Sequence, residues 1–183
     1  MKTVFLAVFV FLSIIQVKAQ VLENLDPLVT DRPGQGTDAP GVLSPGRVQV
    51  ELGFLYQDDP ISNQQLILYP NTLVRVGLVE RVEFRASADI FQGGIGEPTY
   101  LSPIILGTKI GLTENRGIIP QSALIVNVTM PKEEPLEVSN PIATPELRLL
   151  MNHGLSKSLS LTTNLGISWA NDRGTFQYPN HSY

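Results

Sequence analysis

The chain after residue 46 alternates between apolar and polar side chains with a period of two. The segment from Arg47 to Gln57 begins this pattern. Through position 54, its odd residues are Arg, Gln, Glu and Gly, and its even residues are Val, Val, Leu and Phe. Successive side chains of a β-strand point to opposite faces, so this alternation is typical of a strand with one apolar and one polar face. We therefore predict an all-β, antiparallel fold.

Seven segments carry this pattern and are predicted to be strands. Pro70 cannot donate a hydrogen bond to a strand ladder, so the regular part of the second strand is expected to start at Asn71. The sixth segment also fits a short helix, with Thr144 as its cap and Pro145 as its first residue, but its alternation favours a strand. The predicted strands are Arg47–Gln57, Asn71–Leu78 with an irregular start at Leu66, Val82–Phe91, Pro103–Leu112, Ile118–Met130, Thr144–His153 and Ser158–Ala170.

The connections between these strands are predicted to alternate between long and short. Only Val79, Glu80 and Arg81 separate the second and third strands, which indicates a tight hairpin. Longer connections follow the first, third and fifth strands, among them Gln92–Ser102 and Pro131–Ala143. Long connections at one end and short turns at the other are typical of up-and-down barrels of the outer membrane.

The first 46 residues lack the alternation. Lys2, the apolar run from Val4 to Ile15 and the small residue Ala19 are typical of a cleavable secretory signal peptide. The following stretch is rich in proline and glycine, which favours an extended periplasmic segment. The predicted parts are a signal peptide at 1–19, an extended segment at 20–46 and a barrel domain at 47–183.

Composition narrows the function. The chain has 183 residues, a net charge of -4 and no cysteine. The charge gives no basic surface for nucleic acid, and the lack of cysteine excludes disulfides, thiolate metal sites and a thiol nucleophile. The sequence also has no nucleophile elbow, phosphate-binding glycine loop or cluster of metal ligands at usable spacing. We therefore predict that the protein is not an enzyme and uses no cofactor.

Two-faced strands fit either a soluble barrel with its apolar face inside or a membrane barrel with its apolar face outside. The polar faces are rich in Gly, Ser, Thr and Asn, which is typical of a lumen. Aromatic side chains gather near strand ends beside the long connections, where an interfacial girdle would lie. They are Phe54, Tyr56, Tyr69, Phe91, Tyr100 and Trp169. We predict a transmembrane β-barrel that is localised to the outer membrane and contacts its lipid.

The polar faces also carry charges of both signs. We expect these charges either to pair with one another, because unpaired charges in a narrow lumen are costly, or to form a polar pathway that selects solutes. The predicted lumen residues are Arg47, Glu51, Arg75, Glu83, Arg85, Asp89, Lys109, Glu146 and Arg148.

The stretch from Thr30 to Pro40 contains an unusual combination of residues. Opposite charges at Asp31 and Arg32 lie beside Pro33, which has a fixed backbone angle. We predict that this stretch, with Thr30, Asp31, Arg32 and Pro33 at its start, folds into the periplasmic mouth as a plug. Asp31 and Arg32 would then meet lumen charges such as Glu51, Glu83 or Arg75. The alternative is a disordered tether.

Three runs, TDRPGQGTDAP, PGRVQVELGFLY and NTLVRVGLVERVEFRASADI, together resemble the outer-membrane transporter family named for the MetA pathway of phenol degradation. The resemblance covers about Thr30 to at least Gly166. It implies an exported β-barrel and the uptake of hydrophobic or aromatic solutes. The chain departs from the family pattern at Gly34 and Gly36, where the family has an acidic residue and Gln-Thr directly after the proline. Chains of the family are also usually longer.

Bacterial single-chain barrels close with an even number of strands, so seven strands predict an incomplete barrel or a poorly formed last strand in Asn171–Tyr183. The predicted function is a channel or transporter for small solutes in the outer membrane. Two alternatives remain at this point. One is a soluble, lipocalin-like periplasmic barrel that binds an apolar ligand, and the other is a structural or adhesive outer-membrane barrel.

Overall fold

The computed structural model describes residues 30–31, 38–59, 64–94, 96–132, 141–156 and 158–169. The predicted signal peptide and the stretch Asn171–Tyr183 lie outside these residues. None of the described residues belongs to a helix that is long and apolar enough to span a membrane.

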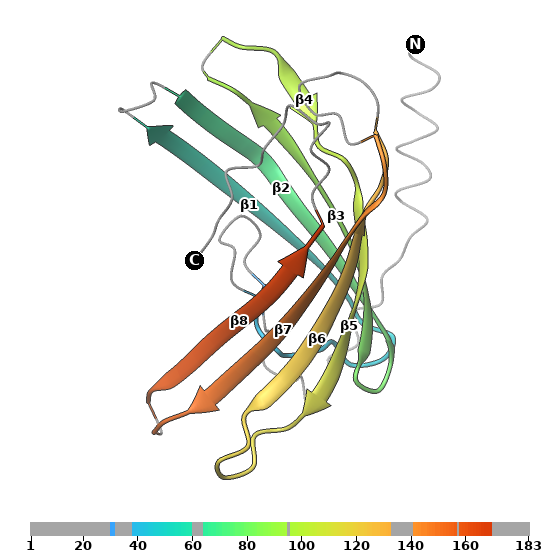
Figure 1. The fold of residues 1–183 in the computed structure, drawn as a ribbon, viewed down its shortest axis with the longest axis vertical. Coiled ribbons are helices and arrows are strands. Elements are labelled where there is room, and N and C mark those ends of the chain that lie inside the picture. The colour runs from blue at the N-terminus through green and yellow to red at the C-terminus, as the bar shows by residue number, and fades with distance from the viewer. Residues whose placement is uncertain are drawn as a thin grey trace, which may run out of the picture.

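The described chain forms one antiparallel sheet. Its strands are β1 (Val48–Asp59), β2 (Gln64–Val79), β3 (Val82–Gln92), β4 (Thr99–Leu101), β5 (Ile105–Thr113), β6 (Gln121–Thr129), β7 (Thr144–Gly154) and β8 (Ser160–Ser168). Seven strands follow one another in the order β1-β2-β3-β5-β6-β7-β8, and β4 pairs with β3. Figure 1 shows that the sheet curls into a half-barrel with β1 and β8 at its two ends. The prediction of an all-β, antiparallel, up-and-down fold is confirmed.

Strand β2 runs through Pro70 and is longer than predicted. Its ladder with β1 has a bulge, because Gly53 pairs with Asn71 whereas Leu55 pairs with Leu68. A bulge leaves an extra residue outside the regular ladder, which explains why a proline is tolerated here. The bulge also shifts the alternation of side chains, so that Leu68 and Asn71 are both buried.

Two further differences from the sequence prediction concern connections, and one ambiguous element is resolved. The connection after β1 comprises only residues 60–63, because β1 and β2 both extend beyond their predicted ends. The glycine-rich connection after β3 contains β4, in which Tyr100 pairs with Phe91. The stretch Thr144–Gly154 is a strand, as predicted, because β6 and β8 pair with it on both sides.

The two faces of the half-barrel differ in an unusual way. Side chains of β2, β3, β5 and β7 converge on the N-terminal residues Asp31 and Asp38, so this face is concave. The concave face buries charge: Arg75 and Lys109 are each 0% exposed. The convex face displays apolar side chains, with Leu52 68% and Phe54 66% exposed. The polar face is therefore inside and the apolar face is outside.

Only some of the aromatic side chains predicted for the girdle are exposed. Phe54 and Tyr69 pack edge to face on the convex surface, with ring centroids 6.0 Å apart, and Tyr56 and Trp169 are exposed. Phe91 does not belong to this group. As an odd-numbered residue of β3 it shares the concave face with Glu83 and Arg85, and it is buried there in an apolar cluster. That cluster consists of Leu68, Phe91, Leu55, Leu66 and Tyr100.

Candidate functional site

A charged cluster occupies the middle of the concave face. Strand pairing places Arg75 beside Arg85 and Glu83 beside Lys109, so that charges of neighbouring strands lie next to one another. An N-terminal strap, defined here as residues 30–31 and 38–46, runs across these side chains. The charged cluster consists of Glu51 from β1, Arg75 from β2, Glu83 and Arg85 from β3, Lys109 from β5, and Glu146 and Arg148 from β7.

Arg75 is the centre of the cluster and is completely buried. Its Nε and Nη2 donate to the two carboxylate oxygens of Glu83, each at 2.8 Å. Its Nη1 donates to Glu51 at 3.1 Å, and Nη2 also donates to the carbonyl of Gly41 in the strap at 3.0 Å. The fork of a guanidinium fits such paired contacts with a carboxylate. Arg75 therefore links β1, β3 and the strap.

Asp31 places a carboxylate among the cations of the cluster. Its Oδ2 lies 2.5 Å from Lys109 Nζ and 3.5 Å from Arg75 Nε, and it also accepts a hydrogen bond from Arg85 Nη1. The backbone N–H of Asp31 donates to Glu51 at 2.9 Å. Burial alone would raise the pKa of Asp31, but Lys109, Arg85 and Arg75 together hold this pKa below its ordinary value. Asp31 is therefore bound as an anion.

Asp38 forms the second carboxylate anchor of the strap. It accepts hydrogen bonds from Arg85 Nη2 at 2.8 Å and from Arg148 Nη1 at 2.6 Å. The side-chain amide of Asn164, oriented so that its oxygen and its nitrogen both have partners, binds the backbone of Asp38. Asn164 Oδ1 accepts from the Asp38 N–H at 2.9 Å, and Asn164 Nδ2 donates to the Asp38 carbonyl at 3.2 Å. Arg148 also pairs with Glu146. Asp38 thus connects the strap to β3, β7 and β8.

Backbone groups of the strap add further contacts. Lys109 Nζ donates to the carbonyls of Ala39 at 2.9 Å and Gly41 at 3.2 Å. The Leu43 N–H donates to Glu83 at 2.8 Å. At the end of the strap, the Gly46 N–H donates to the carbonyl of Gly77 at 2.9 Å. The strap is therefore bound to the strands of the concave face through both its carboxylates and its main chain.

The structure brings most of the predicted lumen residues together, and Asp31 joins them. Arg47 lies just before β1, where its carbonyl accepts a hydrogen bond from the Gly77 N–H at 2.9 Å. Asp89 lies farther along β3, where its N–H donates to Ser102 Oγ at 2.8 Å and its carbonyl accepts from the Ser102 N–H at 2.7 Å. Thr30 is exposed. The predicted plug residues Arg32 and Pro33 lie outside the described residues.

Sequence reasoning missed Asp38. It lies in the proline- and glycine-rich stretch, which has no periodicity to indicate where its side chains point. The one available signal was its negative charge, since the predicted lumen residues include five cations and only four anions, namely Arg47, Arg75, Arg85, Lys109 and Arg148 against Glu51, Glu83, Asp89 and Glu146.

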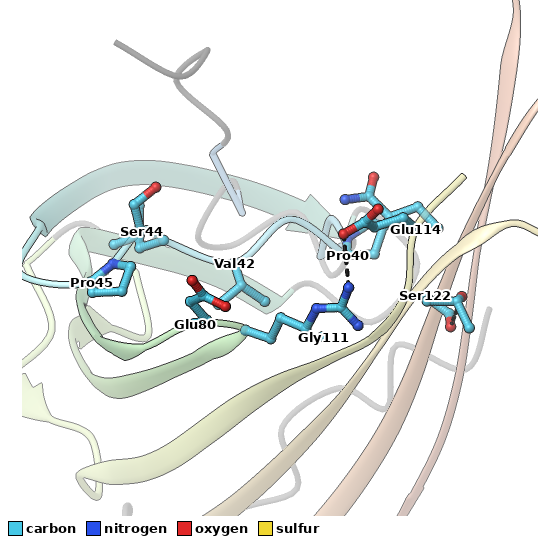
Figure 2. Close-up of a pocket in the computed structure, with 12 residues that line it drawn as sticks. Pro40, Val42, Ser44, Pro45, Glu80, Gly111, Glu114 and Ser122 are labelled. Carbon is cyan, nitrogen blue, oxygen red and sulfur yellow. Dashed lines mark hydrogen bonds and ion pairs between the residues drawn. The ribbon is translucent and has the colours of Figure 1, made fainter. Parts of the chain in front are cut away.

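A pocket of about 360 Å³ lies between the strap and the turns at the same end of the sheet (Figure 2). The strap supplies one wall, which includes Pro40 and Val42. The turn after β2 and the end of β5 supply the other, where Arg81 Nη2 donates to Glu114 Oε1 at 2.8 Å. This ion pair is exposed, and exposed pairs contribute little to stability. Because the strap forms one wall, the shape of the pocket depends on the position of the strap.

The family model described as "Putative MetA-pathway of phenol degradation" matches residues 30–182. The chain belongs to this family. The predicted resemblance is confirmed and extends beyond Gly166. Comparisons with curated proteins and with solved structures found no significant match. The matched region of this chain begins at Thr30. It therefore contains the whole strap together with the strands that bind it.

In this member of the MetA-pathway family, the backbone of the strap lies directly against Gly77 of β2. A Cβ at this position would lie 2.1 Å from the carbonyl oxygen of Ser44 and 2.8 Å from that of Leu43. Both are backbone atoms, so Gly77→Ala must push the strap away from β2. We expect a loss of stability of about 1–3 kcal/mol, typical of overpacking, and faster protease cleavage in the strap. Urea unfolding and limited proteolysis measure the two effects.

Gly93→Ala is the matched control, because a Cβ at Gly93 would have no atom within 4 Å. This variant should behave like the unmodified protein. If Gly77→Ala left the cleavage rate of the strap unchanged, the close approach of Ser44 to Gly77 would be contradicted.

Proposed function

We propose that the protein is an outer-membrane β-barrel that passes small solutes through its lumen. The observation that carries this proposal is the reversed placement of apolar and charged side chains. In water, each Å² of apolar surface left exposed on side chains such as Leu52 and Phe54 would lose about 25 cal/mol of the free energy that burial provides. Burying Arg75, Glu83 and Lys109 adds a desolvation cost of several kcal/mol per ion before pairing. In a bilayer the convex face contacts hydrocarbon, so its exposure to the surroundings is favourable.

Other features support the same location. The N-terminal residues have the pattern of a cleavable export signal. Phe54, Tyr56, Tyr69 and Trp169 are exposed aromatic side chains, as an interfacial belt requires. The connections 93–104 and 130–143 are longer than 80–81, 114–120 and 155–159 at the other end of the strands, as in outer-membrane barrels, whereas 60–63 at the same end as the long ones is short.

The concave face supports passage of a solute better than storage of an apolar ligand. A lipocalin-like barrel would present apolar side chains to its ligand, whereas the middle of this face carries the charged cluster. The family description implies solutes related to phenol degradation, and the apolar cluster of Leu68 and Phe91 at one end of the concave face suits hydrophobic or aromatic ones. An adhesive barrel would act through its connections and would need no path through the lumen.

Cell fractionation and solute uptake test the proposal. We expect the full-length protein to sediment with the outer membrane and to migrate differently on a gel before and after heating. Recovery in the soluble periplasmic fraction would exclude the membrane barrel. Purified protein in liposomes should then increase the uptake of small solutes relative to empty liposomes. A folded membrane protein that gave no uptake would favour the structural or adhesive alternative.

A further inference from the structure

We propose that the position of the Asp31 carboxylate is a binding site for the carboxylate group of a small solute, which displaces the strap when it binds. This inference rests on the proposed function, because it names the class of solute that the lumen would take. The Asp31 carboxylate would then occupy the site of the solute carboxylate. The strap would leave the lumen only when another carboxylate replaces that of Asp31.

The first argument is the distribution of charge on the strands. Arg75 has two carboxylate partners on the strands, Glu51 at 3.1 Å and Glu83 at 2.8 Å, and Arg148 pairs with Glu146. Within the described chain, Arg85 and Lys109 reach only Glu83 among the strand carboxylates, at 3.5 and 3.7 Å. Because Glu83 is already bound by Arg75 at shorter range, the strap provides the main counter-charges of Arg85 and Lys109.

The second argument is the geometry around Asp31. Among the described residues, the groups that contact its Oδ2 are side chains of the strands: the ammonium of Lys109 at 2.5 Å and the guanidinium groups of Arg85 and Arg75. Its Oδ1, by contrast, accepts a hydrogen bond from Ala39 within the strap, at 3.1 Å. Guanidinium and ammonium groups at such distances recognise carboxylates. A free carboxylate would therefore meet the same donors that now hold Asp31.

The third argument is that the site is prepared before a solute arrives. Lys109 and Arg75 are completely buried, and Arg75 is oriented by both oxygens of Glu83. A neutral solute that displaced the strap would leave Arg85 and Lys109 without Asp31 and Asp38, and a buried charge that loses its partner is costly. The site therefore discriminates in favour of anions. A carboxylate additionally matches the fork of Arg85.

Displacement follows from competition for one position. A solute that binds only after the strap has left shifts the equilibrium toward the open form, by a factor of about 1 + [solute]/Kd. The open fraction should accordingly rise up to about 100-fold at a concentration 100 times Kd, until the strap is fully released. The same carboxylate that opens the strap would also occupy the lumen.

Thiol labelling tests this inference, since the chain contains no cysteine. Val42→Cys places a thiol on the strap, where the Val42 side chain packs toward Gly111. The full-length protein in detergent micelles is treated with a neutral thiol reagent at pH 7, and acetate replaces chloride at constant ionic strength. We expect labelling of Val42→Cys to accelerate with acetate in a saturable manner, and acetamide to have no effect. Labelling of Ile118→Cys, on a turn and 96% exposed, should be independent of acetate.

Asp31→Asn provides a second test that leaves every strand residue intact. In the Val42→Cys background this change should give fast labelling without acetate and little further acceleration with it. Equal labelling rates in acetate and chloride, or equal acceleration by acetamide, would overturn the carboxylate site. So would slow labelling in the Asp31→Asn protein. The assay uses neither a membrane nor transport, so its failure leaves the proposed function standing, and absence of the protein from the outer membrane would leave an acetate effect intact.

Discussion

Replacement of Glu83 by alanine is expected to destabilise the protein by about 3–5 kcal/mol, the range measured when one partner of a buried ion pair is removed. Glu83 is completely buried and binds Arg75 through both carboxylate oxygens at 2.8 Å. It also accepts the N–H of Leu43 at 2.8 Å. Without Glu83, Arg75 keeps only part of its counter-charge and the strap loses one anchor. Urea unfolding in detergent micelles should show a lower midpoint with an unchanged slope.

Glu114→Ala is the matched control for Glu83→Ala. Glu114 is also a glutamate paired with arginines, at 2.8 Å from Arg81 and 3.1 Å from Arg116, but its side chain is exposed on a turn. Its pKa is lowered by Arg116 and Arg81, yet water screens these contacts, so the substitution should change stability little. Similar losses for the two variants would contradict the conclusion that the concave face is the buried one.

Leu52→Arg is expected to disfavour insertion into a bilayer by about 2–4 kcal/mol, the cost of an arginine at the lipid-facing midplane of a barrel. Leu52 lies near the middle of β1 on the convex face and is 68% exposed. In the competing interpretation no such cost is expected, because an exposed arginine on a water-soluble barrel would leave stability unchanged or improve solubility. Folding into lipid vesicles, followed by the heat-dependent gel shift, measures the cost.

Ile118→Arg introduces the same charge at a position that is even more exposed but lies outside the strands, in the connection between β5 and β6. It should insert as well as the unmodified protein. If Leu52→Arg and Ile118→Arg both inserted normally, the convex face would not be a lipid-facing surface.

Local properties of the sequence were sufficient to predict the seven long strands and most of the residues on each of their faces. Alternation with a period of two depends only on neighbouring residues, and it correctly separated Glu51 from Leu52 and Glu83 from Phe84. It also placed the hairpin at Glu80 and Arg81, because a turn is a short-range feature.

Pairing between strands decided the elements that local signals left ambiguous or missed. Thr144 and Pro145 would suit the start of a helix. As a strand, however, this stretch forms backbone hydrogen bonds with β6 on one side and β8 on the other. The bulge beside Pro70 places Leu68 on the concave face, where it meets Phe91. Such contacts join residues far apart in the sequence, so no local pattern contains them.

The curvature of the sheet decided which face lies inside. Alternation is identical for a barrel with charged or apolar contents, so the sequence by itself determined that two faces exist and which residues each face carries. Only the tertiary structure turns the charged face inward and brings Asp31 and Asp38 against Arg85, Lys109 and Arg148. The physical reason is that a buried charge needs partners, and these partners come from five strands and a strap that meet only when the sheet curls.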